Sequence, residues 1–242
     1  MNLGLRDRVA LVTASSKGLG RASADALAAE GARVVICARG TEALDEAAAA
    51  IRAAGGEVTA VPLDVTRPEA PSSLVRTAVE TYGRLDIVVA NAGGPPAGRS
   101  LDVTDDVLEA AVQANLLTSV RLVREAVPHM RAQRWGRVCL ITSVTVRQPA
   151  RDLAASSTAR AGLWAWAKTA AADLFGDGIT VNLACPGYHA TDRVKALGIP
   201  EDLPMGDPAD FGKVVAFLCS EPANFVSGIA MGVDGATVSG LL

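Results

Sequence analysis

The stretch VALVTASSKGLG, residues 9–20, decides the fold of this chain. An apolar run breaks at Thr13 into a turn of small residues, and the chain continues as the helix-like segment RASADALAAEGA. Small residues let a backbone approach phosphate groups closely, and the free N–H groups at the start of a helix attract negative charge. A strand, a tight turn and a helix in this order therefore predict a binding site for a dinucleotide pyrophosphate.

Apolar, β-branched runs recur along the chain, and alanine-rich segments long enough for helices separate them. The runs occupy residues 8–13, 33–38, 57–63, 85–90, 137–143, 178–185 and 228–233. They are nearly continuous rather than alternating, which is typical of parallel strands covered on both faces. We therefore predict the α/β class, with a Rossmann-type doubly wound parallel sheet of seven strands in a three-layer sandwich. The length of 242 residues suits one domain over residues 1–242.

The charge pattern and the rare residue types exclude several classes of function. The net charge of −3 comes from interleaved signs and leaves no basic patch for nucleic acid. The N-terminus MNLGLRDR lacks an apolar signal core and no run is long enough to cross a bilayer, so we expect a cytoplasmic protein without membrane contact. Four cysteines without C-x-x-C spacing and two histidines predict buried thiols, no metal site and no Ser-His-Asp triad.

Two loops and one helix bear on assembly and access. The stretches GGPPAG (93–98) and GIPEDLPMGDP (198–208) read as loops, and the second resembles a mobile flap over a site. The segment 150–175 is apolar on nearly every side, although Arg160, Lys168 and Asp173 exclude a membrane span. A helix with two buried faces packs on its own sheet and on a partner subunit, so we expect a homo-oligomer.

Polar and small residues follow the ends of the predicted strands, where ligands bind in doubly wound sheets. The motifs TASSKGLG (13–20), LDV (63–65), ANAGG (90–94), Asn115, ITSV (141–144) and CPGYHAT (185–191) stand in this order. Together they resemble the short-chain dehydrogenase/reductase superfamily, and in particular its 3-oxoacyl-carrier-protein reductase-like members. The ending SGIAMGVDGATV (227–238) resembles the C-terminal strand and tail through which these proteins form tetramers. The resemblance thus implies a homotetramer.

The resemblance also assigns cofactor roles to matching positions. It implies that the turn cradles the pyrophosphate through Thr13, Ser15, Ser16, Lys17, Gly18, Leu19 and Gly20. The adenosine would be met by Asp64, Val65, Asn91, Ala92 and Gly93, and the nicotinamide carboxamide by Pro186, Gly187, His189 and Thr191, with His189 acting through its backbone. The first glycine of the family's turn is Ala14 here, which we expect to weaken binding at most.

Charge at the end of the second strand predicts the choice of cofactor. An acidic residue there would accept the ribose hydroxyls of NAD and repel a 2′-phosphate. This chain has Arg39 at that place, and Lys17 lies in the glycine turn. Two cations where the phosphate would lie favour NADP(H).

The usual proton donor of the family is missing. Members that reduce carbonyls carry a tyrosine about thirteen residues after the catalytic serine and a lysine four residues later. Counting from Ser143, those positions hold Ser156 and Arg160. Serine is a far poorer acid than tyrosine, whereas an arginine can still hydrogen-bond the ribose but does not release a proton. Cofactor binding is thus expected to survive where proton transfer is impaired.

Three alternatives follow from this replacement. Hydride chemistry can persist with another donor, either Tyr188 or a water held by Ser143, Ser156 and Asn115. The protein can bind NADP(H) for non-redox chemistry, sensing or structure. Activated substrates can also react with electrostatic help from Ser143 and Arg160 alone. We predict an NADP(H)-dependent oxidoreductase acting on a small-molecule carbonyl/alcohol pair, in which Ser143 polarises the oxygen, Arg160 fixes the ribose and Asn115 supports a water.

Overall fold

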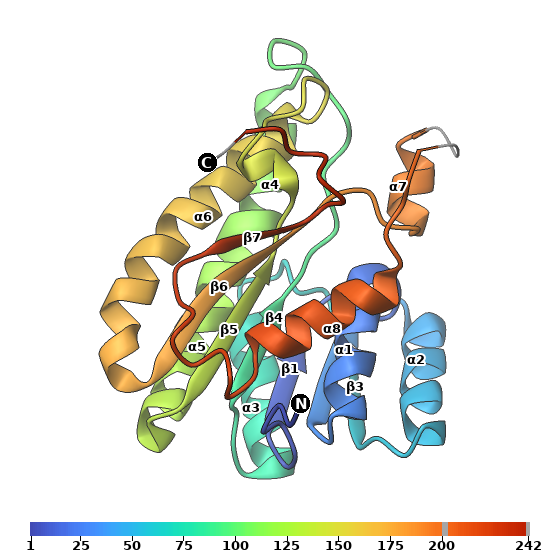
Figure 1. Ribbon diagram of the computed structural model, residues 1–242. Helices are drawn as coiled ribbons and strands as arrows, with labels where there is room; N and C mark the ends of the chain where they lie inside the picture. Colours follow the sequence, from blue (N-terminus) through green and yellow to red (C-terminus); the bar gives the residue numbers. More distant parts are fainter. Residues whose placement is uncertain (200–202, 241–242) are drawn as a thin grey trace.

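The computed structural model describes residues 1–199 and 203–240, which form a parallel sheet of seven strands (Figure 1). Its order is β3-β2-β1-β4-β5-β6-β7, so the winding direction reverses between β1 and β4. The strands are Val9–Val12 (β1), Arg33–Ala38 (β2), Val58–Pro62 (β3), Ile87–Ala90 (β4), Gly136–Ile141 (β5), Ile179–Pro186 (β6) and Ala230–Val233 (β7). The predicted doubly wound Rossmann-type sheet is confirmed, with each strand within a few residues of its expected limits.

Helices cover both faces of the sheet and complete the three layers. They are Gly18–Ala29 (α1), Thr41–Ala53 (α2), Ala70–Tyr82 (α3), Asp105–Val112 (α4), Thr118–Gln133 (α5), Ala154–Leu174 (α6), Asp192–Ala196 (α7) and Pro208–Leu218 (α8). One core packs α3, α5 and α6 against the sheet, and the other packs α1, α2 and α8 against the opposite face. Within β1, Val9 and Leu11 enter the first core and Ala10 and Val12 enter the second, because successive side chains of a strand point to opposite faces.

A charged cluster fastens the edge of the sheet where the strands begin. Asp86, fully buried before β4, pairs with Arg8 at 3.2 Å and with Arg84 at 2.6 Å. The ring of Trp135 is stacked between two guanidinium groups, with Arg8 3.7 Å and Arg137 4.3 Å from its centroid. These contacts join the starts of β1, β4 and β5, because each charge is matched by a carboxylate or an aromatic face.

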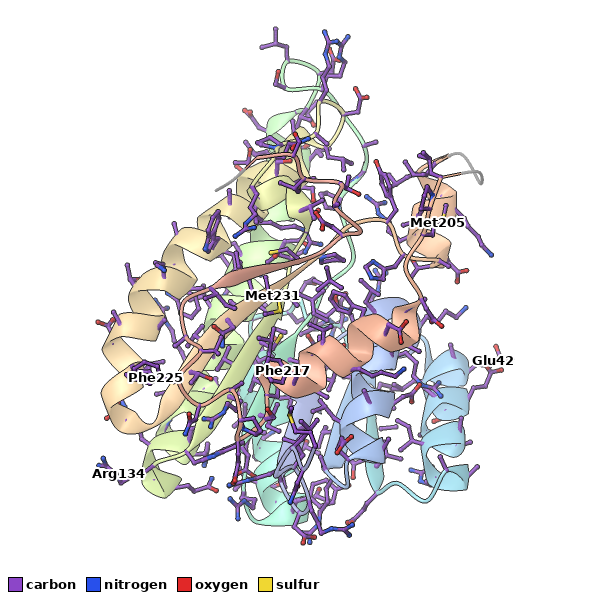
Figure 2. The ribbon with its side chains drawn as sticks, viewed as in Figure 1. Glu42, Arg134, Met205, Phe217, Phe225 and Met231 are labelled. Carbon is purple, nitrogen blue, oxygen red and sulfur yellow. The ribbon has the colours of Figure 1, made fainter. Side chains whose placement is uncertain are left out.

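Three further expectations concern thiols, membranes and the flap. All four cysteines are buried and free, and burial raises the pKa of the Cys37 thiol to about 12 and that of Cys185 to about 11. Within residues 1–199 and 203–240, no helix combines the length and the apolarity that crossing a bilayer requires. The predicted flap at 198–208 lies partly outside the described residues, and its described part contains Met205, beside α7 in Figure 2.

Candidate active site

Two adjoining cavities run along the carboxyl ends of the strands. One, of about 700 Å³, reaches from the glycine turn to the ends of β5 and β6, and the other, of about 630 Å³, lies at the ends of β2 and β3. They share Ala14, Lys17, Arg39, Ala92, Gly93 and Gly94 as lining residues. We call the two together the cleft. The structure thus brings to one place the strand-end residues that the sequence pointed to.

The glycine turn is held by side chains that do not line the cleft. The Thr13 hydroxyl donates to the carbonyl of Asn91 at 2.7 Å and accepts from the Asn91 N–H at 2.8 Å, which ties β1 to the end of β4. The buried Ser15 hydroxyl donates to the Val12 carbonyl at 2.7 Å and accepts from the Cys37 N–H at 3.1 Å. Thr13 and Ser15 were expected to contact the phosphates, but their hydroxyls instead fix the conformation of the turn by hydrogen bonds to the neighbouring strands.

Backbone geometry explains why the turn needs small residues. Gly18 adopts a left-handed conformation with φ of +58°. A Cβ on Gly20 would strike the Ala14 carbonyl oxygen and stand 2.6 Å from Asn91 Nδ2. Ala14 itself has φ of +46°, a region that costs an alanine about 1–2 kcal/mol. The glycine that the resemblance places at this position would adopt this conformation without strain, whereas alanine adopts it at that cost.

The start of α1 fits a cofactor pyrophosphate. Lys17 is its N-cap in extended conformation, and no side chain caps the first turn. The N–H groups of Gly18, Leu19 and Gly20 have no partner within the helix, because the first turn lacks preceding carbonyls. Gly18, Leu19 and the exposed Lys17 line the cleft, so these groups are available to an anion there.

The far end of the cleft, beyond β2 and β3, carries the residues expected around the adenosine. Ser16, Arg39, Asp64 and Val65 line it. Asp64 Oδ1 accepts from the Thr66 N–H at 3.0 Å and from the Thr66 hydroxyl at 2.8 Å, and these bonds are the main cause of a lowered pKa of Asp64, with smaller contributions from Arg39 and Arg67. In the described part of the chain, neither Lys17 nor Arg39 is within 4.0 Å of a carboxylate.

Ser143 lies at the other end, whereas Asn115 lines the cavity at the ends of β2 and β3. Ser143 lines the cleft and caps a short helical turn at 144–146, its Oγ accepting from the Thr145 N–H at 3.2 Å. This bond uses a lone pair and leaves the hydroxyl proton for a ligand. Asn115 stands in a π-helical segment, Gln113–Leu117, between α4 and α5. Its Oδ1 is buried and has no hydrogen-bond partner within the described residues, so it is a ready acceptor for a water.

Ser156 and Arg160, at which the sequence resemblance places a tyrosine and a lysine, occupy the first half of α6. Both are buried, and both line the cleft. Arg160 Nη1 donates to the carbonyls of Ile141 and Thr142, each at 3.0 Å, and its Nε donates to Ser156 Oγ at 3.3 Å. The guanidinium therefore ties α6 to the end of β5, a role that a lysine would fill with fewer donors.

The two tyrosines and His189 occupy different environments. Tyr188 lines the cleft and is 36% exposed. Tyr82 hydrogen-bonds Thr59 at 2.9 Å in the neighbourhood of β3, outside the cleft lining. His189 is buried, with its ring 5.2 Å from that of Phe211 and its Nδ1 3.3 Å from the Gly187 carbonyl oxygen, while its own carbonyl accepts from the Thr191 N–H at 2.7 Å. Thr191 lies against the turn, 3.7 Å from the position of a Cβ on Gly18. Pro186 and Gly187 complete this wall of the cleft.

Sequence reasoning missed several lining residues. Thr237 and Val238 come from the C-terminal tail, whose Ser239 N–H donates to Gln148 Oε1 at 3.2 Å. Arg193, at the start of α7, also lines the cleft. The sequence pointed to the tail for assembly and not for the cleft, whereas Arg193 follows the CPGYHAT motif by two residues, so its position beside the site was available from the sequence. Among the residues that the structure describes, no cluster of ligands suits a metal ion.

Comparisons with known proteins agree with this geometry. A family profile described as short chain dehydrogenase matches residues 8–202. The 3-oxoacyl-(acyl-carrier-protein) reductase of Synechocystis sp. is 36% identical over 243 residues, which cover 97% of this chain and 98% of that protein. The structure of L-sorbose reductase from Gluconobacter frateurii, complexed with NADPH and L-sorbose, is 30% identical and superposes with a TM-score of 0.93 over 100% of both chains.

A 7α-hydroxysteroid dehydrogenase, complexed with NADH and 7-oxo glycochenodeoxycholic acid, is 28% identical with a TM-score of 0.93. The match covers 100% of this chain and 98% of that one. One of these structures thus holds NADPH and the other NADH. The chain belongs to the short-chain dehydrogenase/reductase superfamily, whose members are oxidoreductases that use a nicotinamide cofactor.

Proposed function

We propose that the protein is an NADP(H)-dependent oxidoreductase acting on a carbonyl/alcohol pair of a small molecule. The observation that carries the proposal is the cleft, which has two exposed cations where its two cavities adjoin and a serine, an arginine and a tyrosine in the larger cavity. Bound NADPH would supply a hydride in the larger cavity. The chain's own residues would bind, orient and protonate the substrate.

The cations support NADP(H) over NAD(H). Lys17 and Arg39 line both cavities of the cleft, and no acidic residue directly follows β2 to accept ribose hydroxyls. A phosphate on the ribose forms charge-assisted hydrogen bonds with such cations. The uncapped start of α1, at Gly18 and Leu19, suits the pyrophosphate between the two halves of the cofactor.

Each residue at the reacting end has a proposed role. Ser143 would donate its hydroxyl proton in a hydrogen bond to the substrate oxygen, since its Oγ already accepts from Thr145. Arg160 would hold the nicotinamide ribose, and the Oδ1 of Asn115, which lines the adjoining cavity, would hold a water. Tyr188 would deliver the proton to the developing alkoxide, as it is the phenol of the cleft lining. Ser156, whose Oγ accepts from Arg160, would help to hold a water in the alternative route.

The fixation of Arg160 favours a second candidate function. Its contacts with Ile141 and Thr142 give it a structural task at the place where the family has a lysine beside the reacting atoms. A cleft that binds NADP(H) but lacks the acid on α6 also suits a catalytically silent or non-redox relative. In that case the cofactor would be a ligand to be sensed or a structural element.

A binding and turnover experiment separates the two candidates. NADPH and NADH are titrated by fluorescence, and loss of NADPH absorbance is then followed with a panel of ketones and quinones. The proposal expects tighter binding of NADPH than of NADH and turnover with at least one compound. Tight NADPH binding without turnover across the panel supports the silent relative, and absence of binding of either cofactor contradicts both.

Two variants test the proton donor. Tyr188→Phe keeps the aromatic wall and removes the phenol proton, so we expect kcat to fall by roughly 10²–10⁴-fold, the usual contribution of a general acid. Unchanged kcat would exclude Tyr188 and leave the water route. The double variant Ser156→Tyr with Arg160→Lys restores the family pair, and we expect it to raise kcat if only proton delivery was lost. No gain would indicate that the cleft itself is reshaped.

We also propose that the protein assembles as a homotetramer. The exposed side of α6 carries small residues, with Ala161, Ala165 and Ala172 at the surface, and this helix forms one flank of the molecule (Figure 1). Phe225, 86% exposed, stands beside Phe175 at a ring separation of 5.7 Å, next to the lower half of α6 in Figure 2. Light scattering after size-exclusion chromatography measures the assembly, and a monomer at micromolar concentration would contradict the proposal.

A further inference from the structure

The cleft contains a second guanidinium group, that of Arg193, which the proposed reaction does not use. Arg193 reaches from the first turn of α7 across to the loop that follows β4. Its Nη2 donates to the Pro95 carbonyl at 2.7 Å, and both Nε and Nη2 lie 3.0 Å from the position that a Cβ on Gly94 would occupy. Loop and side chain thus hold the guanidinium at one place over the cleft.

Arg193 and Arg160 act on each other electrostatically. Burial is the main cause that lowers the pKa of Arg160 to about 10, and the charge of Arg193 lowers it further. Two cations that repel one another raise the free energy of the protein without a ligand, and an anion placed between them lowers it. The cavity that Arg160 and Arg193 both line is therefore suited to a negatively charged group.

Carboxylates of the protein do not neutralise these cations. In residues 1–199 and 203–240, no carboxylate oxygen comes within 4.0 Å of either guanidinium group. Asp192 is the acidic residue that lines this cavity in the described part of the chain, and it also lines a neighbouring groove beside Arg21 on α1. Under the proposed function, the phosphates of the cofactor would have other partners, namely Lys17, Arg39 and the start of α1.

We propose that the substrate carries a carboxylate and that Arg193 binds it. A carboxylate accepts two parallel hydrogen bonds from a guanidinium, and Nη2 of Arg193 has a second proton besides the one given to Pro95. Arg193 is then a specificity-determining residue for the substrate, with Arg160 adding positive potential from the floor of the cleft. This inference rests on the proposed function, because it names the substrate class of the same site.

Calorimetry on the NADP⁺-loaded protein tests the inference without requiring turnover. The probes are alpha-, beta- and gamma-keto acids with aliphatic and aryl tails, each compared with its own methyl ester. We expect at least one acid to bind about tenfold or more tightly than its ester, the range of a hydrogen-bonded charge pair. Arg193→Leu is expected to abolish this preference and Arg193→Lys to keep part of it. NADP⁺ affinity is expected to stay unchanged in both variants.

Lys195→Leu provides the matched control, because it removes a cation from the same helix but lies outside the cleft lining. It should leave the preference for acids intact. The inference is overturned if acids and esters bind equally, if no acid binds, or if Arg193→Leu weakens NADP⁺ binding while the acid preference persists. Failure of the proposed function appears separately, as absence of cofactor binding, and it overturns the inference as well.

Discussion

Replacing Arg39 by alanine tests the choice of cofactor most directly. Arg39 is exposed, lines both cavities and follows β2, where the ribose phosphate of NADP(H) is proposed to lie. Loss of one hydrogen bond to a charged group costs about 1.5–3 kcal/mol. Because the side chain is exposed and water screens its charge, we take the lower value, about 1.5 kcal/mol, which corresponds to roughly a tenfold rise in Kd for NADPH. NADH lacks the phosphate, so its Kd is expected to stay the same.

The assay is a fluorescence titration of both cofactors into each protein at fixed ionic strength, since salt screens exposed charges. Arg67→Ala is the matched control. Arg67 is an exposed arginine that also acts on Asp64, but it does not line the cleft, and its loss should change neither Kd. The reasoning is refuted if Arg39→Ala weakens NADPH and NADH equally, or if it weakens neither. Equal weakening would mean that Arg39 contacts a part that the two cofactors share.

Three further changes concern the turn and its surroundings. Ala14→Gly should relieve a left-handed alanine and raise Tm by about 2–4 °C, which corresponds to about 1 kcal/mol in a chain of this size, as measured by thermal unfolding. Gly20→Ala should drive a Cβ into the Ala14 carbonyl, lower the free energy of unfolding by about 1–3 kcal/mol and weaken NADPH binding, and wild-type affinity in this variant would contradict the cradle. The hydrogen bonds from Thr66 lower the pKa of Asp64 and so stabilise the folded protein. This stabilisation is complete at pH values above the ordinary aspartate pKa of about 3.9, and it is lost as the pH falls through the lower pKa of the folded state. Urea unfolding should therefore show Asp64→Asn less stable than wild type at neutral pH but equal to it in acid, and a constant difference would argue against the assignment.

The fold was predictable because its determinants are local and repeated. Each strand is an apolar run long enough to be recognised by itself, and alternation with alanine-rich helices leaves few ways to build a sheet. The turn at 13–20 was predictable for the same reason, since a run of small residues between a strand and a helix is typical of a tight turn that binds phosphate. Strand limits shifted by a residue or two, as at Val9, because pairing with neighbours sets the ends of a strand.

The site was predictable as a set of positions but not as a set of contacts. Asn115 was identified by its place in the order of motifs, yet the π-helical turn around it depends on packing between α4, α5 and α6. The bonds of Arg160 to Ile141 and Thr142 join parts of the chain that meet only in the folded protein. Val238 reaches the cleft because the tail after β7 returns over it, and a tail without regular structure has no periodicity to read.

The cluster around Asp86 bears on how such a protein can change over time. Its ion pairs and the stacked Trp135 secure the sheet at the edge opposite the cleft. Substitution of residues such as Ser156 and Tyr188 is therefore expected to affect the stability of the fold little, because these ion pairs and the stacked ring lie at the opposite edge of the sheet. Because the stabilising contacts and the reacting residues lie in different parts of the molecule, one proton donor can be replaced by another during evolution without loss of the fold.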